Sequence, residues 1–337
     1  MQVRIRSDVF KDGGYLGELD NLLAYFRKGK HILCLDDYDD IEAYNDSKWK
    51  KDLNSRDIKV IESYIRSSVK FNKSYKSITV SLNDNKIDFL PREAEKYLDQ
   101  TLMILLENSQ YDSPFLNAIF RHFDNENIIL KAKTEQFWKY CLGGGSSFVN
   151  VIQAELNESF QDACYTKDKK KYLRYFVVLD SDKFYPEMEV DSTKTDFLVE
   201  NEVPFHILIK REKENYVPLN LLGRLDSRYL KEYIKFPKDV QRDYFDLEKG
   251  FHDKNYNKLP DPIKTLYPAE DVLDEPFKIL RKGMDIDLYK KGGIKKEFSL
   301  LFNDATKEGL LKIIGHQSRI NKLNEFEHIV NEVKKIL

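Results

Sequence analysis

Short apolar segments bounded by charged residues recur in the middle of this chain. LMILLEN (102–108), YLRYFVVLD (172–180) and FHILIK (205–210) show little polar alternation, which is typical of strands covered on both faces of a sheet. Segments with helical periodicity lie between them, at 113–123 and after the glycines at 143–145. Strands that alternate with helices predict a parallel, doubly wound α/β sheet.

The chain of 337 residues is long enough for about two or three domains. We expect a β-rich N-terminal domain at 1–98, the parallel sheet flanked by helices at 99–235, and a mostly helical C-terminal region at 236–337. The last region ends in an amphipathic segment, 318–337, in which apolar residues recur at helical spacing.

Local patterns predict further elements within these domains. In the N-terminal domain, HILCL (31–35), SITVSL (78–83) and KIDFLP (86–91) are predicted strands. The last two flank Asn83-Asp84-Asn85, a signal for a hairpin. In the α/β segment we expect helices at 92–100 and 134–141 and a short strand at 127–130.

The composition predicts a protein without a membrane partner. Hydrophobic residues make up 41% and charged residues 33% of the chain. No apolar run reaches the roughly 20 residues that a membrane helix needs, and MQVRIRSDVF lacks the apolar core of a signal peptide. Cys34, Cys141 and Cys164 are widely spaced and form no CxxC pair, which is typical of reduced thiols. We therefore expect a cytoplasmic protein.

The charge distribution leaves nucleic-acid binding open. The net charge is −2, whereas nucleic-acid-binding proteins are often strongly basic. Local basic clusters occur at Lys169, Lys170 and Lys171 and between residues 281 and 296. Such runs are usually solvated faces, but they can also follow a phosphate backbone. The chain contains no GxxxxGK[ST] motif, so no ATPase site is predicted.

Acidic residues follow the predicted strands. Glu107 follows the first, Asp180 and Asp182 end a later one, and Glu212 and Glu214 come after the last. Ligands bind outside the carboxyl ends of strands in an open α/β sheet, so these acids are expected to converge. An extended backbone sends residues two apart, such as Asp180 and Asp182, to the same side. Clustered carboxylates repel one another, and a hard divalent cation relieves that repulsion.

Simpler structural roles are open for the same residues. Aspartate is common in turns after strands, and a glutamate at a strand end can face solvent. The glycines at 143–145 suit a flexible entry to a helix as well as a close approach of the backbone to phosphate. A second acidic group at Asp36, Asp37, Asp39 and Asp40 is local and has no second strand to converge with. We expect that group to be solvated surface.

Taken in order, these motifs resemble the Toprim pattern of topoisomerases, primases and OLD-family nucleases. LLENSQYDSPFLNAI (105–119) is similar to the first motif, a glutamate after a strand and an aspartate before a helix. GGGSS (143–147) is similar to the glycine turn, and VVLDSDK (177–183) to the Asp-x-Asp motif. KREKENYVP (210–218) is similar to the Glu-Asn-Tyr signature of the OLD-like and DUF4435-like phage-defence branch. The resemblance covers residues 100–235, which is under half of the chain.

The resemblance implies a Toprim-like fold and a metal-dependent nuclease that cleaves DNA or RNA, tRNA included. Catalytic roles are implied for Glu107, Asp180, Asp182 and Glu214. Ligation of Mg²⁺ or Mn²⁺ is implied for Glu107, Asp112, Asp180 and Asp182. Contacts to nucleic-acid phosphates are expected from Gly143, Gly144, Gly145, Lys169, Lys170 and Lys171. Lys183, Lys210 and Lys249 are candidates for activating water or steadying the transition state.

Nucleic acid is therefore the expected partner. The resemblance to OLD-like and DUF4435-like nucleases implies an effector of a bacterial anti-phage system. Many such proteins work with an ABC-type ATPase, and in this case the ATPase would be a separate subunit. A homo-oligomer is also compatible with the sequence. One alternative is a non-enzymatic Toprim-like scaffold or regulatory subunit that binds a partner ATPase. Another is a primase-like or ligase-like enzyme, which the missing nucleotide-binding motifs disfavour.

Overall fold

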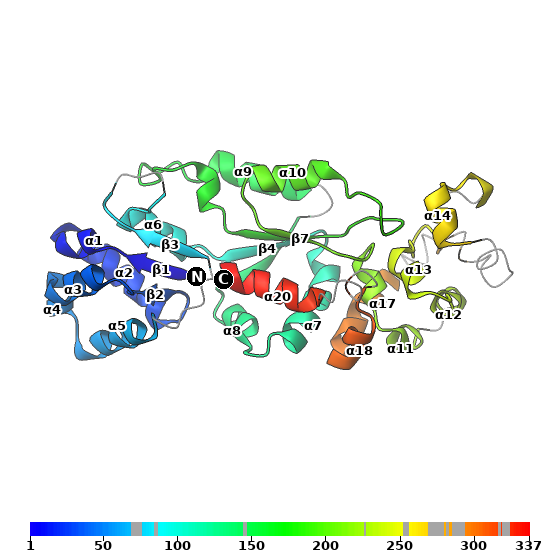
Figure 1. Ribbon diagram of the computed structural model, residues 1–337, viewed down its shortest axis with the longest axis horizontal. Helices are drawn as coiled ribbons and strands as arrows, with labels where there is room; N and C mark the ends of the chain where they lie inside the picture. Colours follow the sequence, from blue (N-terminus) through cyan, green and yellow to red (C-terminus); the bar gives the residue numbers. More distant parts are fainter. Residues whose placement is uncertain are drawn as a thin grey trace.

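The molecule is elongated, and its three parts follow one another along the long axis (Figure 1). The computed structural model describes residues 1–68, 76–83, 87–143, 147–225, 227–251, 256–268, 280, 283–284, 294–315, 318 and 324–337. The N-terminal unit lies at one end, a four-stranded sheet lies in the middle, and a group of short helices lies at the other end. The two chain termini meet near the centre, where the Lys76 amide donates a hydrogen bond to the Lys335 carbonyl at 2.8 Å.

The N-terminal unit is an α/β unit, so the prediction of a β-rich domain at 1–98 is wrong. Its strands are short and parallel, in the order β2 (Ile32–Cys34), β1 (Gln2–Ile5), β3 (Ser77–Val80). Most described residues lie in helices: α1 (Ser7–Lys11), α2 (Leu16–Arg27), α3 (Tyr38–Asp46), α4 (Lys48–Asp52), α5 (Ser55–Ser68) and α6 (Pro91–Asp99). In α2, Leu19, Leu22, Leu23 and Phe26 recur at helical spacing and are all buried.

The predicted hairpin around Asn83 does not form. β3 pairs in parallel with β1, and the bridge that follows it, from Val80 to Phe89, is also parallel. An antiparallel pair is what a tight hairpin requires. Asp84 and Asn85, at the centre of the predicted turn, lie outside the described residues.

The central sheet is parallel throughout, which confirms the predicted α/β architecture. Its strand order is β5 (Trp138–Leu142), β4 (Leu102–Leu106), β6 (Tyr175–Leu179), β7 (Phe205–Ile207). Side chains alternate between two cores, as a pleated strand dictates. Ile104 and Leu106 of β4 enter one core, whereas Leu105 enters the other.

Helices cover both faces of this sheet (Figure 1). Helices α9 (Ser147–Glu158) and α10 (Ser192–Glu200) cover one face, and their Phe148, Ile152 and Leu198 share a hydrophobic core with Leu105. On the other face lie α7 (Ser109–Phe123), α8 (Ile128–Thr134) and α20 (Glu325–Ile336). Helix α20, at the end of the chain, thus helps to cover this face of the sheet. One hydrophobic core contains residues from before and after position 235.

Two elements between β4 and the glycine turn differ from the prediction. Residues 127–130, predicted as a strand, begin helix α8, because Asp124 accepts a hydrogen bond from the Ile129 amide at 2.7 Å. Residues 134–141, predicted as a helix, include most of β5. The sequence WKYCL is rich in aromatic and bulky residues that favour strands, and Trp138 is buried against α8.

The C-terminal region is helical in its described parts, as predicted. It contains α13 (Asp239–Tyr244), α14 (Asp261–Leu266), α17 (Ile294–Leu301) and α18 (Lys307–Lys312), after α11 (Leu219–Leu222) and α12 (Arg228–Ile234). Of the predicted helix at 318–337, α20 forms the part from Glu325, and Phe326, Ile329 and Val333 are buried as its periodicity predicts. Within the described residues, no helix combines the length and the apolar composition needed to span a membrane.

Candidate metal centre

Acidic side chains from separate elements meet at the carboxyl edge of the central sheet. Glu107 directly follows β4, and Asp180 directly follows β6. Asp112 lies in the first turn of α7, the helix that begins after β4. Glu214 lies in a 3-10 turn, Lys213–Tyr216, after β7. The segments after β4, β6 and β7 therefore bring acids to the same edge, as expected for ligand sites in parallel sheets.

A lysine occupies the point on which these acids converge. The Nζ atom of Lys213 lies 3.0 Å from Asp112 Oδ1, 3.2 Å from Asp180 Oδ2 and 3.9 Å from Glu214 Oε2. The main-chain amide of Lys213 also donates to Asp180 Oδ1 at 3.2 Å. Lys213 is only 7% exposed. The ammonium is therefore a buried cation held by carboxylates from three elements.

Two further lysines lie at the rim of the cluster. Lys194 of α10 lies 3.7 Å from Glu107 Oε1, and Lys295 of α17 lies 4.0 Å from Glu214 Oε1. Their side chains are 25% and 30% exposed, so solvent screens these longer pairs more than it screens Lys213. The buried part of the cluster thus carries more carboxylates than ammonium groups.

Burial, followed by the like charges of neighbouring acids, shifts the pKa values of the acids toward their neutral forms. Burial, together with the charges of Glu107, Glu214 and Asp112, outweighs Lys213 and raises the pKa of Asp180 to about 7. Burial likewise raises the pKa of Glu107 and of Asp112, although Lys213 opposes both shifts. Burial lowers the pKa of Lys213, but the surrounding carboxylates outweigh it and raise that pKa well above its usual value. The site is short of positive charge.

Asp182 does not lie beside Asp180 in the way that strand alternation predicts. Strand β6 ends at Leu179, and Asp182 has a left-handed backbone with φ of 55°. Its side chain is exposed, whereas Asp180 is largely buried. Asp182 still contributes to the site, because its charge is among the causes that raise the pKa of Glu107. It is a rim carboxylate rather than a central one.

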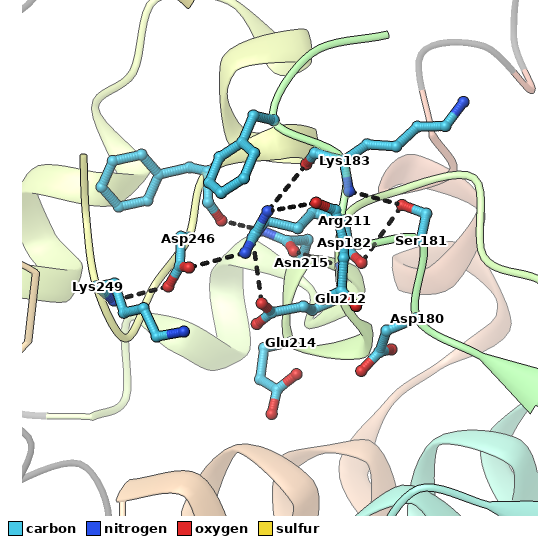
Figure 2. Close-up of polar contacts among 12 residues, drawn as sticks. Asp180, Ser181, Asp182, Lys183, Arg211, Glu212, Glu214, Asn215, Asp246 and Lys249 are labelled. Atoms are coloured by element: carbon cyan, nitrogen blue, oxygen red, sulfur yellow. Dashed lines mark hydrogen bonds and ion pairs between the residues drawn. The ribbon is translucent and has the colours of Figure 1, made fainter. Parts of the chain in front are cut away.

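A buried ion-pair network fixes the loop that carries Asp180 and Asp182 (Figure 2). The Ser181 hydroxyl donates to the Lys210 carbonyl at 2.8 Å. The Arg211 guanidinium donates to the Asp182 carbonyl at 2.8 Å and pairs with Asp246 at 2.8 Å. Figure 2 shows Arg211 between Asp246 and the loop that carries Asp182. Arg211 therefore anchors the loop through hydrogen bonds to its backbone carbonyls.

The Asn and Tyr of the Glu-Asn-Tyr motif have structural roles. The Asn215 amide group donates to the carbonyls of Arg242 and Phe245, at 2.8 and 3.0 Å. The Tyr216 hydroxyl donates to Glu325 of α20 at 2.6 Å. These bonds anchor the turn that presents Lys213 and Glu214. Glu212 directly precedes this turn and pairs with Arg211 at 3.1 Å. Burial raises the pKa of Glu212 well above its usual value.

The residues expected to bind phosphate are not gathered at one place. Gly143 directly follows β5, at the same edge as the acids. A Cβ atom at this position would lie 2.9 Å from the Phe148 Cβ, so the close packing of α9 requires glycine. Gly144 and Gly145 lie outside the described residues. Lys169, Lys170 and Lys171 precede β6, at the opposite edge of the sheet from Asp180. Lys170 and Lys171 also pair with Glu202, at 3.4 and 2.6 Å.

The rival acidic group at 36–40 is divided among structural contacts. Asp36 pairs with Arg4 at 2.9 Å, and Asp37 caps helix α3 through the Asp39 amide at 2.9 Å. Asp40 is buried and accepts a hydrogen bond from the Ser7 amide at 2.7 Å. Asp36, Asp37 and Asp39 are exposed, as expected for solvated surface, whereas Asp40 is buried and bound within the N-terminal unit.

The central cluster suits a hard cation, but its present arrangement is built around an ammonium. Carboxylate oxygens are the ligands that Mg²⁺ and Mn²⁺ prefer. Across the described ranges, no three His, Cys, Asp or Glu side chains have the spacing of a preformed metal site. Asp112 and Asp180 are instead turned toward Lys213. Glu107, Asp112, Asp180 and Glu214 carry the oxygen donors that such an ion would take in place of the ammonium.

Lys213 is a site residue that the sequence patterns did not single out. They pointed to Lys183, Lys210 and Lys249, but Lys210 pairs with Asp243 at 2.8 Å and with the Asn215 carbonyl, away from the acids. The available signal was the position of Lys213 between two glutamates after the last strand. Strand alternation would turn it away from Glu214, whereas the 3-10 turn brings both into the cluster.

Comparisons with known proteins give no match to this chain among protein-family models, curated proteins or solved structures. The assignment of function therefore depends on the geometry of the site and on the resemblance of its motifs.

Proposed function

We propose that this protein is a metal-dependent nuclease of the Toprim type. The observation that carries the proposal is the convergence of Glu107, Asp112, Asp180 and Glu214 at the carboxyl edge of a parallel sheet. Acids buried together are costly unless a cation compensates them. One buried ammonium faces several carboxylates here, so that compensation is incomplete.

The proposed division of labour assigns each acid by its position. Glu107, Asp112 and Asp180 would hold a Mg²⁺ or Mn²⁺ ion, with Glu214 beside them and Asp182 at the exposed rim. A bound ion of this kind polarises a phosphoryl oxygen, lowers the pKa of a bound water and stabilises the leaving oxygen. Arg211, Ser181 and Asn215 hold the loops that carry these acids. The exposed rim at Asp182 is where a phosphodiester backbone would enter.

Cations near the site support an anionic substrate. Lys194 and Lys295 lie on two different helices at the rim and are partly exposed. Ammonium groups in such positions attract phosphates in a sequence-independent, salt-dependent manner. The lysines at 169–171 lie at the far edge of the sheet, so they would contact nucleic acid outside the cleavage site.

A cleavage assay tests the proposal. Purified protein is incubated with plasmid DNA or total tRNA in Mg²⁺, in Mn²⁺ or in EDTA. We expect cleavage of at least one substrate in metal and none in EDTA. Asp180→Asn should lower the rate by at least about 100-fold, because loss of several kcal/mol of transition-state stabilisation has that effect. The Asp36→Ala and Asp39→Ala double variant is the matched control and should cleave normally.

A non-enzymatic scaffold is the second candidate, and the buried Lys213 is the observation that favours it. An ammonium that satisfies Asp112 and Asp180 would stabilise the fold without metal. In that case neither metal would bind or stabilise the protein, and no substrate would be cut. A separate ATPase subunit and a role in anti-phage defence are proposals from the resemblance alone.

A further inference from the structure

Lys213 occupies the position at which the proposed function requires a metal ion. We propose that Lys213 is an internal counter-ion that takes the place of that cation in the metal-free protein, an inference that rests on the proposed function. A divalent ion can enter only when this ammonium leaves. Lys213 would therefore set the metal affinity of the site.

The contacts of Lys213 place its charge within the group of candidate ligands. Its ammonium lies 3.0 Å from Asp112 and 3.2 Å from Asp180, which are distances of direct ion pairs. The same oxygens that would bind a metal thus contact an ammonium instead. A divalent ion held by these oxygens would lie beside a unit positive charge, and the two cations would repel each other.

The backbone of Lys213 is anchored, whereas its side chain is the part that can move. The amide of Lys213 donates to Asp180, and the turn is fixed by Asn215 and Tyr216. The side chain is long and has several rotatable bonds. Its ammonium can therefore leave the cluster without unfolding the turn.

The rim lysines provide the comparison that separates this role from a general electrostatic effect. Lys194 contacts one acid of the cluster, at 3.7 Å, and is partly exposed. Removal of its charge changes the field at the site but vacates no ligand position. Lys171 pairs with Glu202 before β6 and is remote from the acids. Lys194→Met and Lys171→Met are therefore graded controls for Lys213→Met.

Isothermal titration calorimetry with MnCl₂ measures the effect directly in the full-length protein. Without the Lys213 charge, the ion pairs with Asp112 and Asp180 no longer compete with the metal, so binding should tighten by roughly tenfold or more. We expect this change in Lys213→Met and in Lys213→Gln, a smaller one in Lys194→Met and none in Lys171→Met. Unchanged affinity in both Lys213 variants would overturn the inference. Absence of Mn²⁺ binding in every protein, wild type included, would instead contradict the proposed metal centre.

A second measurement uses the wild-type protein, in case the Lys213 variants do not fold without metal. Amine acetylation followed by mass spectrometry reports how accessible each lysine is. Lys213 should be protected in EDTA, because it is buried and ion-paired. Saturating Mn²⁺ should increase its labelling several-fold relative to Lys171, which serves as the internal reference. Labelling of Lys213 that stays the same in saturating Mn²⁺ would show that the ammonium is not displaced.

Discussion

Arg211 and Asp182 bind each other in both directions. Nη1 of Arg211 donates to the Asp182 carbonyl at 2.8 Å, and the Asp182 amide donates to the Arg211 carbonyl at 3.1 Å. Arg211 belongs to the segment after β7, and Asp182 to the loop after β6. This reciprocal pair fixes the two loops that carry the acids, and the buried pair with Asp246 fixes the guanidinium in turn.

Replacement of this guanidinium should therefore destabilise the protein strongly. Arg211→Met removes the buried partner of Asp246, and loss of one member of a buried pair costs about 3–5 kcal/mol. The free energy of unfolding, measured by urea denaturation, should fall by that amount. The Arg211→Met and Asp246→Asn double variant should recover part of it. A loss within about 0.5 kcal/mol, the range of surface substitutions, would contradict the structural role.

The pKa of Asp180 predicts how the metal-free protein responds to pH. The folded-state pKa of about 7 exceeds the ordinary value of 3.8, so the folded protein binds this proton more tightly. The stabilisation from that proton is full below pH 3.8 and is lost as pH rises through about 7. Asp180→Asn cannot lose a proton, so its unfolding free energy in EDTA should fall less between pH 5 and pH 8, a range chosen around the folded pKa of about 7. Identical slopes for both proteins would contradict the prediction.

Magnesium should stabilise the protein through Asp180 more than through Asp182. At ten times the dissociation constant, Mg²⁺ should add about 1.4 kcal/mol to the unfolding free energy of the wild type. Asp180→Asn should lose this response. Asp182→Asn should keep part of it, because Asp182 is exposed at the rim. Asparagine tolerates the left-handed backbone at this position, so it is a better substitution than alanine. Calorimetric melting temperatures in Mg²⁺ and in EDTA provide the measurement.

Neutralisation of Lys169, Lys170 and Lys171 should weaken nucleic-acid binding without abolishing cleavage. On duplex DNA, each lysine–phosphate pair that is removed lowers the log–log salt slope by about 0.9. Lys170 and Lys171 already pair with Glu202, so we expect a smaller change than three free lysines would give. The cleavage rate at saturating substrate should stay unchanged, because these lysines lie at the other edge of the sheet. An unchanged salt slope would show that the three lysines are only a solvated face.

Local sequence patterns were sufficient to predict β4, β6 and β7 of the central sheet and the convergence of Glu107, Asp180 and Glu214, but they missed the edge strand β5. Apolar runs identified β4, β6 and β7, and the position of Glu107 and Asp180 directly after strands identified the edge at which they lie. Both predictions succeed because strand composition and parallel topology decide these features. The short elements at 127–142 were misjudged, because their type depends on the Asp124 cap and on burial of Trp138.

The charge at the centre of the cluster, in contrast, follows from long-range packing. Asp182 leaves the strand geometry in a left-handed turn, so alternation could not predict its exposure. Lys213 enters the cluster because Asn215 bonds to the chain around α13 and Tyr216 bonds to α20. These partners are far away in the sequence, and such contacts form only when the whole core packs. A local pattern can bring acids to an edge, but the packed core determines which side chain lies among them.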